Sequence, residues 1–223
     1  METDRKDFLI GNLKIVRIPH GILRTNSYLI YSAGRKSAIL IDPGENSNAV
    51  EEEVKRSGLE IKMIVLTHGH FDHACAAGEL ARSHGAKIAM SSRDLFFLDL
   101  DRKAMESFGL KSSSCSFWAD IDLSNENDLS VEGLKMRVLR VPGHSPGSVS
   151  FLINDGEACL TGDTLFRGFV GRTDFPGGSE DELKKSLRTL VDLLGDQALI
   201  LPGHGPETSM KNERKWLLEW IGY

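Results

Sequence analysis

Residues 67–73, Thr-His-Gly-His-Phe-Asp-His, form a dense cluster of side chains that bind metal ions. His68, His70, Asp72 and His73 lie within six positions, directly after the apolar run Met63–Leu66. A shuffled chain of this composition would contain the pattern H-x-H-x-D-H only on the order of once per thousand trials. Helix capping by adjacent His and Asp residues is therefore a weak alternative to a metal site.

Three further candidate ligands, His144, Asp163 and His204, each follow a predicted strand and stand beside a glycine. The strands are expected at 135–141, 158–161 and 198–201. Loops at strand ends commonly carry functional side chains, and a glycine allows the backbone to approach closely. We therefore expect four strand ends to meet at one edge and to bring seven ligands together.

Seven ligands exceed the needs of one catalytic zinc ion, which takes three protein ligands and leaves a position for water. Two divalent ions fit the number. The expected ligands of the first ion are His68, His70 and His144; those of the second are Asp72, His73 and His204; Asp163 bridges them. Imidazole and carboxylate groups suit zinc, which we prefer, and also iron or manganese.

Two cations about 3.5 to 4 Å apart would share a bridging hydroxide and polarise a carbonyl group. The expected chemistry is hydrolysis, or a reaction with oxygen if a single iron binds. Asp72 is the candidate catalytic residue, because its carboxylate could accept a proton during the reaction.

The surrounding pattern predicts two successive halves in which strands precede helices. The first half has strand patterns at 13–18, 27–31, 38–41 and 63–66, and helix patterns at 46–57 and 72–84. The second half adds strands at 135–141, 149–153, 158–161 and 198–201, and a helix that Ser179 caps and that runs to Leu194. Two sheets packed face to face with helices outside would accommodate this order in one domain over residues 1–223.

Two irregular stretches are expected to shape a substrate pocket, residues 91–129 and the glycine-rich loop 167–178. The C-terminal segment is amphipathic. Its residues Trp216, Trp220 and Tyr223 could contact a second copy of the chain in a homo-oligomer, although docking on the chain's own core is preferred.

Composition and charge favour a small-molecule substrate. The net charge is −5 and no Lys/Arg-rich run occurs, so we expect neither nucleic acid nor a membrane surface as a partner. The N-terminus is charged and lacks an apolar leader pattern, which predicts a cytoplasmic location. Cys75, Cys115 and Cys159 are odd in number and far apart, so reduced, buried thiols are expected.

Three polar residues lie outside the ligand pattern. His20 and His84 are expected to be structural, with His84 at a helix end where an imidazolium suits the helix dipole. Asp42 is either a turn former or an acceptor that orients a metal-bound histidine.

The glycine-rich loop and its flank add four more candidates. Arg172 could bind a substrate anion, but pairing with a buried carboxylate is slightly preferred. Phe166, Phe169 and Phe175 are expected to pack in the core rather than line the substrate site.

The motif at 68–73, together with His144, Asp163, His204 and Leu-Ile-Asp-Pro-Gly at 40–44, resembles the metallo-β-lactamase superfamily over nearly the whole chain. Within it, residues 162–166, 171–179 and 201–209 resemble glyoxalase II-like (hydroxyacylglutathione) hydrolases. The resemblance implies an α+β fold, a four-layer αβ/βα sandwich of two mixed β-sheets flanked by helices. It also implies a dinuclear metal site, with the seven matched residues as ligands.

The resemblance implies hydrolysis of a small thioester. About twenty residues follow His204, so the glutathione contacts that a C-terminal helical extension supplies in these enzymes are not expected. The bridging Asp163 argues against a β-lactam substrate. Persulfide dioxygenases, which use one iron held by counterparts of His68, His144 and Asp163, are the main alternative; lactonases and a non-catalytic metal-binding module are others.

Overall fold

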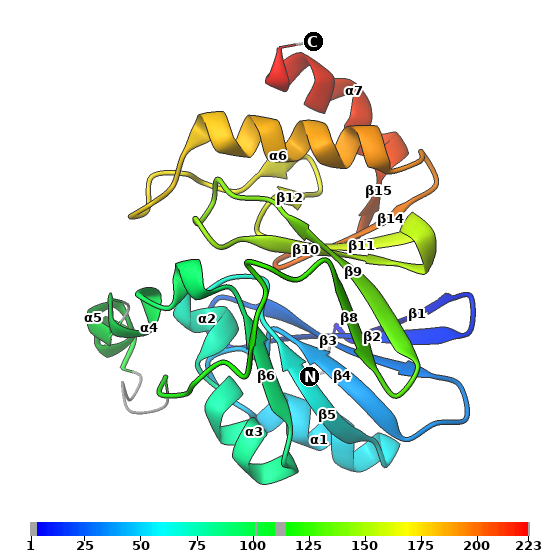
Figure 1. The fold of residues 1–223 in the computed structure, drawn as a ribbon, viewed down its shortest axis with the longest axis vertical. Coiled ribbons are helices and arrows are strands. Elements are labelled where there is room, and N and C mark those ends of the chain that lie inside the picture. Colours follow the sequence, from blue (N-terminus) through cyan, green and yellow to red (C-terminus); the bar gives the residue numbers. More distant parts are fainter. Residues whose placement is uncertain (1–3, 101, 110–114, 223) are drawn as a thin grey trace.

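The computed structural model describes residues 4–100, 102–109 and 115–222 (Figure 1). Its first sheet has seven strands in sequence order. Their bounds are β1 Lys6–Ile10, β2 Leu13–His20, β3 Thr25–Ser32, β4 Ser37–Ile41, β5 Glu60–Val65, β6 Lys87–Met90 and β7 Ile121–Asp122. Strands β1 to β4 are antiparallel, and β4 to β7 are parallel.

The second sheet has six strands in the order β15-β14-β11-β10-β9-β8. Their bounds are β8 Asp128–Val131, β9 Leu134–Arg140, β10 Val149–Ile153, β11 Ala158–Gly162, β14 Leu199–Pro202 and β15 Thr208–Ser209. Only the β11–β14 pair is parallel in this sheet. Both sheets are therefore mixed, as the sequence predicts.

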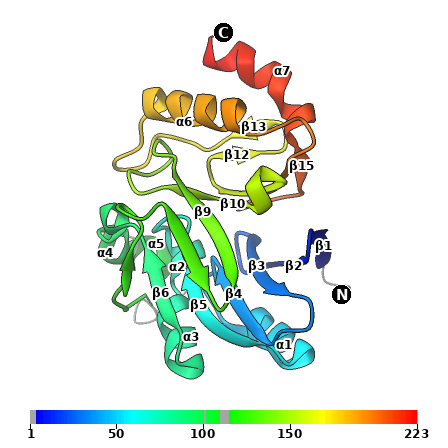
Figure 2. The ribbon, with the colours of Figure 1, turned by 45° about the vertical axis from the view of Figure 1, so that its right-hand side comes forward.

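Helices cover the outer face of each sheet. Helices α1 Asn48–Ser57 and α3 Ala77–His84 pack on the first sheet, and α6 Glu180–Leu193 and α7 Met210–Ile221 on the second. Figures 1 and 2 show the resulting layers from two directions, with the sheets in the middle. The predicted α+β sandwich of two mixed sheets flanked by helices is confirmed.

Alternating side chains of the central strands enter different apolar layers. In β4, Ile39 and Ile41 face the second sheet, whereas Ala38 and Leu40 face α1 and α3. Because both faces are covered, such strands read as continuous apolar runs. A fully buried Leu or Ile contributes about 1.5 to 3 kcal/mol relative to an exposed one, so these layers hold the strand ends in place.

Several predicted boundaries are wrong. Residues 72–84 form two helices, α2 Phe71–Ala74 and α3, because the Ala76 amide donates to the Gly44 carbonyl at 2.9 Å and leaves the helical ladder. The stretch 91–129 holds more regular structure than expected: a turn of 3-10 helix at Ser92–Asp94, helices α4 Phe97–Leu100 and α5 Arg102–Ser107, and strand β7. The N-terminal strand β1 was not predicted.

Two short elements complete the described structure. A hairpin of β12 Leu165–Phe166 and β13 Phe169–Val170 lies in the glycine-rich loop. A single 3-10 turn, Asn154–Gly156, connects β10 to β11. The Gly168 amide at the hairpin turn donates to Glu213 of α7 at 2.9 Å, which fixes the hairpin against the C-terminal helix.

The expectation of three reduced thiols is wrong for two of them. Cys75 and Cys115 form a disulfide, with 4.1 Å between their Cα atoms. Their separation of forty residues disappears in the fold, because the end of α2 packs against the segment that returns at Cys115, with Phe71 and Met105 in the same buried cluster. Cys159 is a buried free thiol, as predicted, and its burial raises the pKa to about 12.

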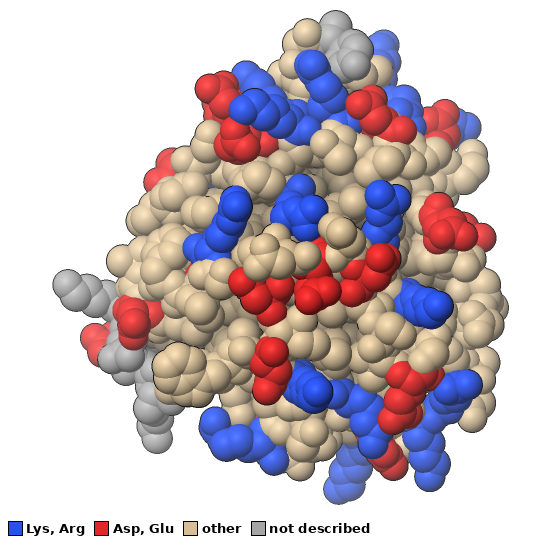
Figure 3. All heavy atoms as spheres, in the orientation of Figure 1, with Lys and Arg blue, Asp and Glu red and all other residues tan. Residues whose placement is uncertain are grey.

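Charges of both signs are interspersed on the face drawn in Figure 3. Within the described residues, no helix has both the length and the apolar character needed to span a membrane. Trp216 and Trp220 of α7 pack against the chain's own apolar core, which is the arrangement preferred from the sequence. Tyr223 lies outside the described residues.

Candidate metal centre

The loop after β5 carries the four clustered ligands. Strand β5 ends at Val65, and the chain then turns into the short helix α2, for which His70 is the N-cap. His68 and His70 precede the helix, while Asp72 and His73 lie in its first turn; all four side chains are buried. One strand and one helical turn thus direct four polar groups to the same place.

The second sheet supplies the other three candidates from loops after β9, β11 and β14. These are His144, Asp163 and His204. The Asp163 carboxylate faces imidazoles of three loops: Oδ2 lies 3.6 Å from His144 Nε2 and 3.5 Å from His204 Nε2, and Oδ1 lies 3.5 Å from His73 Nε2. The predicted convergence of four strand ends is present.

Three groups of side chains have donor atoms within 4.8 Å of one another. They are His68–His70–His144, Asp72–His73–His204 and His68–His73–Asp163. The first two groups are the two ligand sets expected from the sequence. The third joins Asp163 to one histidine of each set, which is where a bridging carboxylate would lie.

Four of the histidines have their outer nitrogen, Nδ1, held away from the centre. The partners are Thr67 Oγ1 at 3.0 Å for His68, Asp42 Oδ2 at 2.9 Å for His73, the Arg172 carbonyl at 2.8 Å for His144 and the Leu23 carbonyl at 3.1 Å for His204. A bond on one ring nitrogen fixes the ring and leaves the other free to bind metal, as is usual at metal sites.

Asp42 fills both of its predicted roles, as an acceptor that orients a candidate-ligand histidine and as a turn residue. It is buried, and its carboxylate accepts from the Thr67 amide at 2.8 Å, from Thr67 Oγ1 at 2.6 Å and from His73 Nδ1. Asp42 also has a positive φ of 46°, so the two roles coincide at one position.

The donor atoms of this cluster are better suited to binding metal ions than to hydrogen bonding with one another. His68 Nε2 and Asp163 Oδ1 are buried without a hydrogen-bond partner. Imidazole nitrogens also approach each other, with 3.0 Å between His144 Nε2 and His70 Nδ1 and 3.2 Å between His73 Nε2 and His204 Nε2. Unpaired buried polar atoms are costly, and divalent cations would satisfy them.

The carboxylates control the protonation of two histidines. Burial alone lowers the pKa of His73, but the charges of Asp72, Asp163 and Asp42 outweigh it and raise that pKa to about 9. Burial also opposes protonation of His204, yet the hydrogen bonds that it donates to Asp163 and Asp72 raise its pKa to about 11. In contrast, burial and then the His144 charge lower the pKa of His70 to about 3.

Metal binding at neutral pH is therefore expected to release about two protons from the chain, one each from His73 and His204, besides the proton that a metal-bound water loses in becoming hydroxide. Both pKa values lie above neutrality, so protons compete with metal and the apparent affinity rises with pH. Calorimetric titration of metal-free protein in buffers of different ionisation enthalpy measures this release. The variant His204→Gln should release about one proton fewer; release that does not change would contradict the assignment.

An aromatic cavity of about 670 Å³ opens onto the centre. Its wall includes six phenylalanines: Phe71, Phe97, Phe108, Phe166, Phe169 and Phe175. The expectation that Phe166, Phe169 and Phe175 only pack in the core is wrong, because the β12–β13 hairpin and the following loop turn all three toward the cavity. Phe175 lies 4.9 Å from the His70 ring, between ring centroids.

Arg172 pairs with a carboxylate, as preferred, but not with a buried one. Its Nε donates to Asp174 Oδ1 at 2.6 Å and Nη2 to Oδ2 at 2.5 Å, and both side chains are more than half exposed. The guanidinium also lies 4.3 Å from the centre of the Phe175 ring. Arg172 therefore lies at the cavity with two of its three guanidinium nitrogens, Nε and Nη2, bonded to Asp174.

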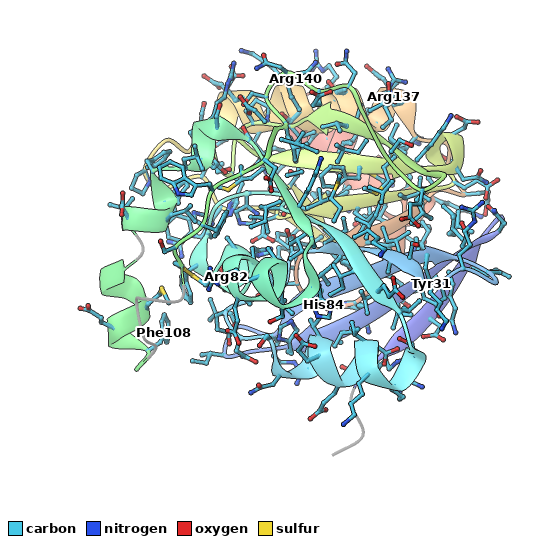
Figure 4. All side chains as sticks on the ribbon, turned by 60° about the horizontal axis from the view of Figure 1, so that its bottom comes forward. Tyr31, Arg82, His84, Phe108, Arg137 and Arg140 are labelled. Carbon is cyan, nitrogen blue, oxygen red and sulfur yellow. A yellow bond between two sulfur atoms is a disulfide. The ribbon has the colours of Figure 1, made fainter. Side chains whose placement is uncertain are left out.

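The remaining two histidines lie outside the centre, as predicted. His84 ends α3, and its Nε2 lies 3.1 Å from Glu51 Oε1 of α1, so it connects two helices (Figure 4). His20 Nε2 lies 2.6 Å from Ser27 Oγ.

Asp94 is a residue that the sequence does not reveal as functional. It is fully buried and accepts from the Gly69 amide at 3.0 Å, the Gly147 amide at 2.6 Å and Ser145 Oγ at 2.5 Å. Gly69 stands between two candidate ligands, and Ser145 follows another. One carboxylate therefore fixes the loop of the first sheet to that of the second.

Asp94→Ala should lower the free energy of unfolding by about 3 kcal/mol, because it leaves three buried donors without an acceptor. Asp94→Asn keeps one acceptor oxygen and should cost less. Urea unfolding of the two variants tests the order; equal stability of Asp94→Ala and the unchanged protein would refute the role.

Gly203 lies against the centre with no room for a side chain. A Cβ atom there would overlap Asp163 Oδ1 and lie 2.8 Å from His73 Cε1. Gly203→Ala should therefore displace ligands and weaken metal binding by about 10- to 100-fold. Gly195→Ala is the control, because nothing lies within 4 Å of its added Cβ. Metal titration of both proteins decides; equal affinities would contradict the expected crowding.

Thr25 was also missed. Its Oγ1 donates to Asp72 Oδ2 at 2.8 Å, and its backbone pairs with His204. Both Thr25 and Asp94 belong to sequence stretches without a recognisable motif or spacing pattern. Their roles are therefore visible only in the folded structure.

The chain belongs to the metallo-β-lactamase superfamily, since residues 20–204 match the profile described as "Metallo-beta-lactamase superfamily". It is a metallo-hydrolase of that superfamily. The chain is 33% identical to the hydroxyacylglutathione hydrolase GloC of Haemophilus influenzae, over 91% of this chain and 96% of the relative. It is 32% identical to the probable metallo-hydrolase YqgX of Bacillus subtilis, over 91% and 95%.

Solved structures agree with this assignment. The fold is similar to BLEG-1 B3 metallo-β-lactamase, with a TM-score of 0.81 and 30% identity over 90% of this chain and 98% of that one. For TTHA1623 in a di-iron-bound form the TM-score is 0.79 and the sequence identity 32%, over 89% of this chain and 96% of that one. For ETHE1 from Myxococcus xanthus the TM-score is 0.71 and the sequence identity 26%, over 95% of this chain and 81% of that one.

Proposed function

We propose that this metallo-hydrolase cleaves small thioesters, in the manner of glyoxalase II, with two divalent ions at the candidate centre. The proposed ligands are His68, His70 and His144 for one ion, Asp72, His73 and His204 for the other, and Asp163 between them. The observation that carries the proposal is the joining of both ligand sets through Asp163. A binding module would need only one closed set.

Zinc is the preferred metal, with iron or manganese as alternatives, because the donors are imidazoles and carboxylates without a thiolate. When bound, such ions supply a hydroxide nucleophile at neutral pH and stabilise negative charge on a carbonyl oxygen. The di-iron form of the similar TTHA1623 structure supports two ions in one such fold and keeps iron open.

The chain's own groups orient the reactants and handle the proton. Thr25 holds the Asp72 carboxylate through Oδ2 at 2.8 Å, which positions Asp72 to accept a proton from the attacking water. In the metal-free chain, burial raises the pKa of Asp72, but the neighbouring His73 and His204 more than reverse this and lower it, so the carboxylate is ionised and available to a metal ion. The six phenylalanines give the cavity an apolar wall beside the candidate ligands.

The proposed reaction balances as a simple hydrolysis. The water oxygen forms a new bond to the acyl carbon, and the carbon–sulfur bond breaks with its electron pair left on sulfur. One water proton ends on the thiolate, and the other is released with the carboxylate product. No external oxidant is required, in contrast to the persulfide dioxygenase alternative.

The alternatives differ in measurable ways. Because the fold is similar to ETHE1 and to a B3 metallo-β-lactamase, the assay of the purified protein should include a persulfide and a β-lactam as well as a lactone. Purified holoprotein should contain about two ions and hydrolyse a thioester without consuming oxygen. One iron per chain with oxygen uptake on glutathione persulfide would favour the dioxygenase. Preferred cleavage of a lactone or β-lactam would replace the thioester.

A further inference from the structure

The cavity over the centre is apolar apart from the candidate ligands and Arg172. Besides its six phenylalanines it is lined by Leu23, Val170, Gly171 and Pro176. Arg172 is the sole Lys or Arg among the described residues of its wall. The wall therefore offers apolar contact area beyond what positioning of a thioester carbonyl requires.

Arg172 is poorly placed to accept a substrate anion. Its Nε and Nη2 both donate to Asp174, and its flat face covers Phe175. A carboxylate on the substrate would reach this guanidinium only through Nη1 or by displacing Asp174. The rest of the wall has no Lys or Arg among its described residues, so burying a charge there is unfavourable. Substrates with several carboxylates, such as glutathione thioesters, do not match this wall.

Several cavity residues remain open to solvent. Phe169 is 55% exposed, Phe108 46% and Leu23 42%, although each lines the cavity. They come from three distant segments: the β12–β13 hairpin, the end of α5 and the turn between β2 and β3. Phe108 can be found at the α5 side of the molecule in Figure 4. Exposed apolar side chains around one opening gain free energy when an apolar ligand covers them.

We propose that the preferred substrate is a thioester whose acyl group is bulky, apolar and uncharged, of roughly six to eight carbons or a phenyl-bearing equivalent. The acyl chain lies along the phenylalanine wall, with the carbonyl at the candidate metal centre. This rests on the proposed thioester hydrolysis, and it separates the chain from an enzyme selective for hydroxyacyl glutathione. Each buried methylene then improves binding about fourfold until the wall is covered.

The first test compares thioesters of one neutral thiol, N-acetylcysteamine, on the metal-loaded protein. The acyl groups are acetyl, butanoyl, hexanoyl, octanoyl, phenylacetyl and the anionic succinyl group, with S-lactoylglutathione beside them. The expected kcat/KM rises about fourfold per methylene from acetyl to hexanoyl, and succinyl and lactoylglutathione are poor. A flat series, or a preference for succinyl or lactoylglutathione, overturns the inference while leaving thioester hydrolysis intact.

The second test does not depend on turnover. Ketone analogues, in which a CH₂ group replaces the thioester sulfur, are titrated calorimetrically across the same chain lengths. Phe169→Ala and Phe108→Ala should flatten the dependence on chain length. Trp118→Ala is the matched control, because Trp118 is 90% exposed and lies outside the cavity wall.

The two tests separate the two proposals. Affinity that rises with chain length in a protein that hydrolyses no thioester upholds the apolar site and rejects the proposed function. Binding with no dependence on chain length, or with the same dependence in both phenylalanine variants and the control, rejects the apolar site.

Discussion

Asp163→Ala is expected to lower thioester hydrolysis by about 1000-fold, equivalent to roughly 4 kcal/mol of lost transition-state stabilisation. Asp163 is the one candidate ligand whose two carboxylate oxygens face histidines of both proposed ligand sets. Its loss removes the bridge and leaves imidazoles without an anion between them. Bound metal should fall from about two ions per chain to about one or fewer.

Elemental analysis and initial-rate assays on the same preparation measure both effects. Asp192→Asn is the control, because Asp192 lies exposed on α6 and its change removes one negative charge far from the centre. A variant that keeps two ions and loses less than about tenfold in rate would show that Asp163 does not join the ligand sets.

Removal of the metal with a chelator should abolish hydrolysis and lower the free energy of unfolding. A metal ion whose free concentration is about a thousand times its dissociation constant contributes about 4 kcal/mol to the free energy of unfolding. The physical reason is the composition of the centre, where buried atoms such as His68 Nε2 and Asp163 Oδ1 have no other partner. The protonation of His73 and His204 in the metal-free protein offsets part of this loss.

Differential scanning calorimetry before and after chelation, and again after addition of zinc, iron or manganese, tests the expectation. The metal that restores both the transition temperature and the rate is the functional one. If chelated, metal-free protein keeps its full rate, the chemistry does not use this centre and the proposed function is wrong.

The candidate centre was largely predictable because its signal is local and chemical. Histidine and aspartate at H-x-H-x-D-H spacing carry the same meaning in any fold, and His144, Asp163 and His204 stand where apolar runs end. They converge because β9, β11 and β14 run in the same direction in the second sheet, and their ends meet the loop after β5 of the first sheet. The ligand roles of all seven residues stay a prediction until metal is measured.

Contacts that depend on tertiary packing were not predictable. Asp94, Thr25 and the Cys75–Cys115 disulfide join segments far apart in sequence, and no period or composition marks them. The phenylalanines were misjudged for the same reason: a side chain that lines a cavity has the same local pattern as one that fills a core. The strand boundaries were better, because alternating burial imprints a period on the sequence.

The organisation into one domain also stays a prediction. So does the cytoplasmic location.

The division of the proposed ligands between the sheets affects how the centre is assembled during synthesis. Residues of the first sheet's loop contribute four side chains, and the second sheet contributes three, ending with His204. A nascent chain therefore cannot hold the complete pair of ions until His204 has left the ribosome. Premature termination anywhere upstream would yield polypeptide with an incomplete coordination sphere, however well its first sheet had folded.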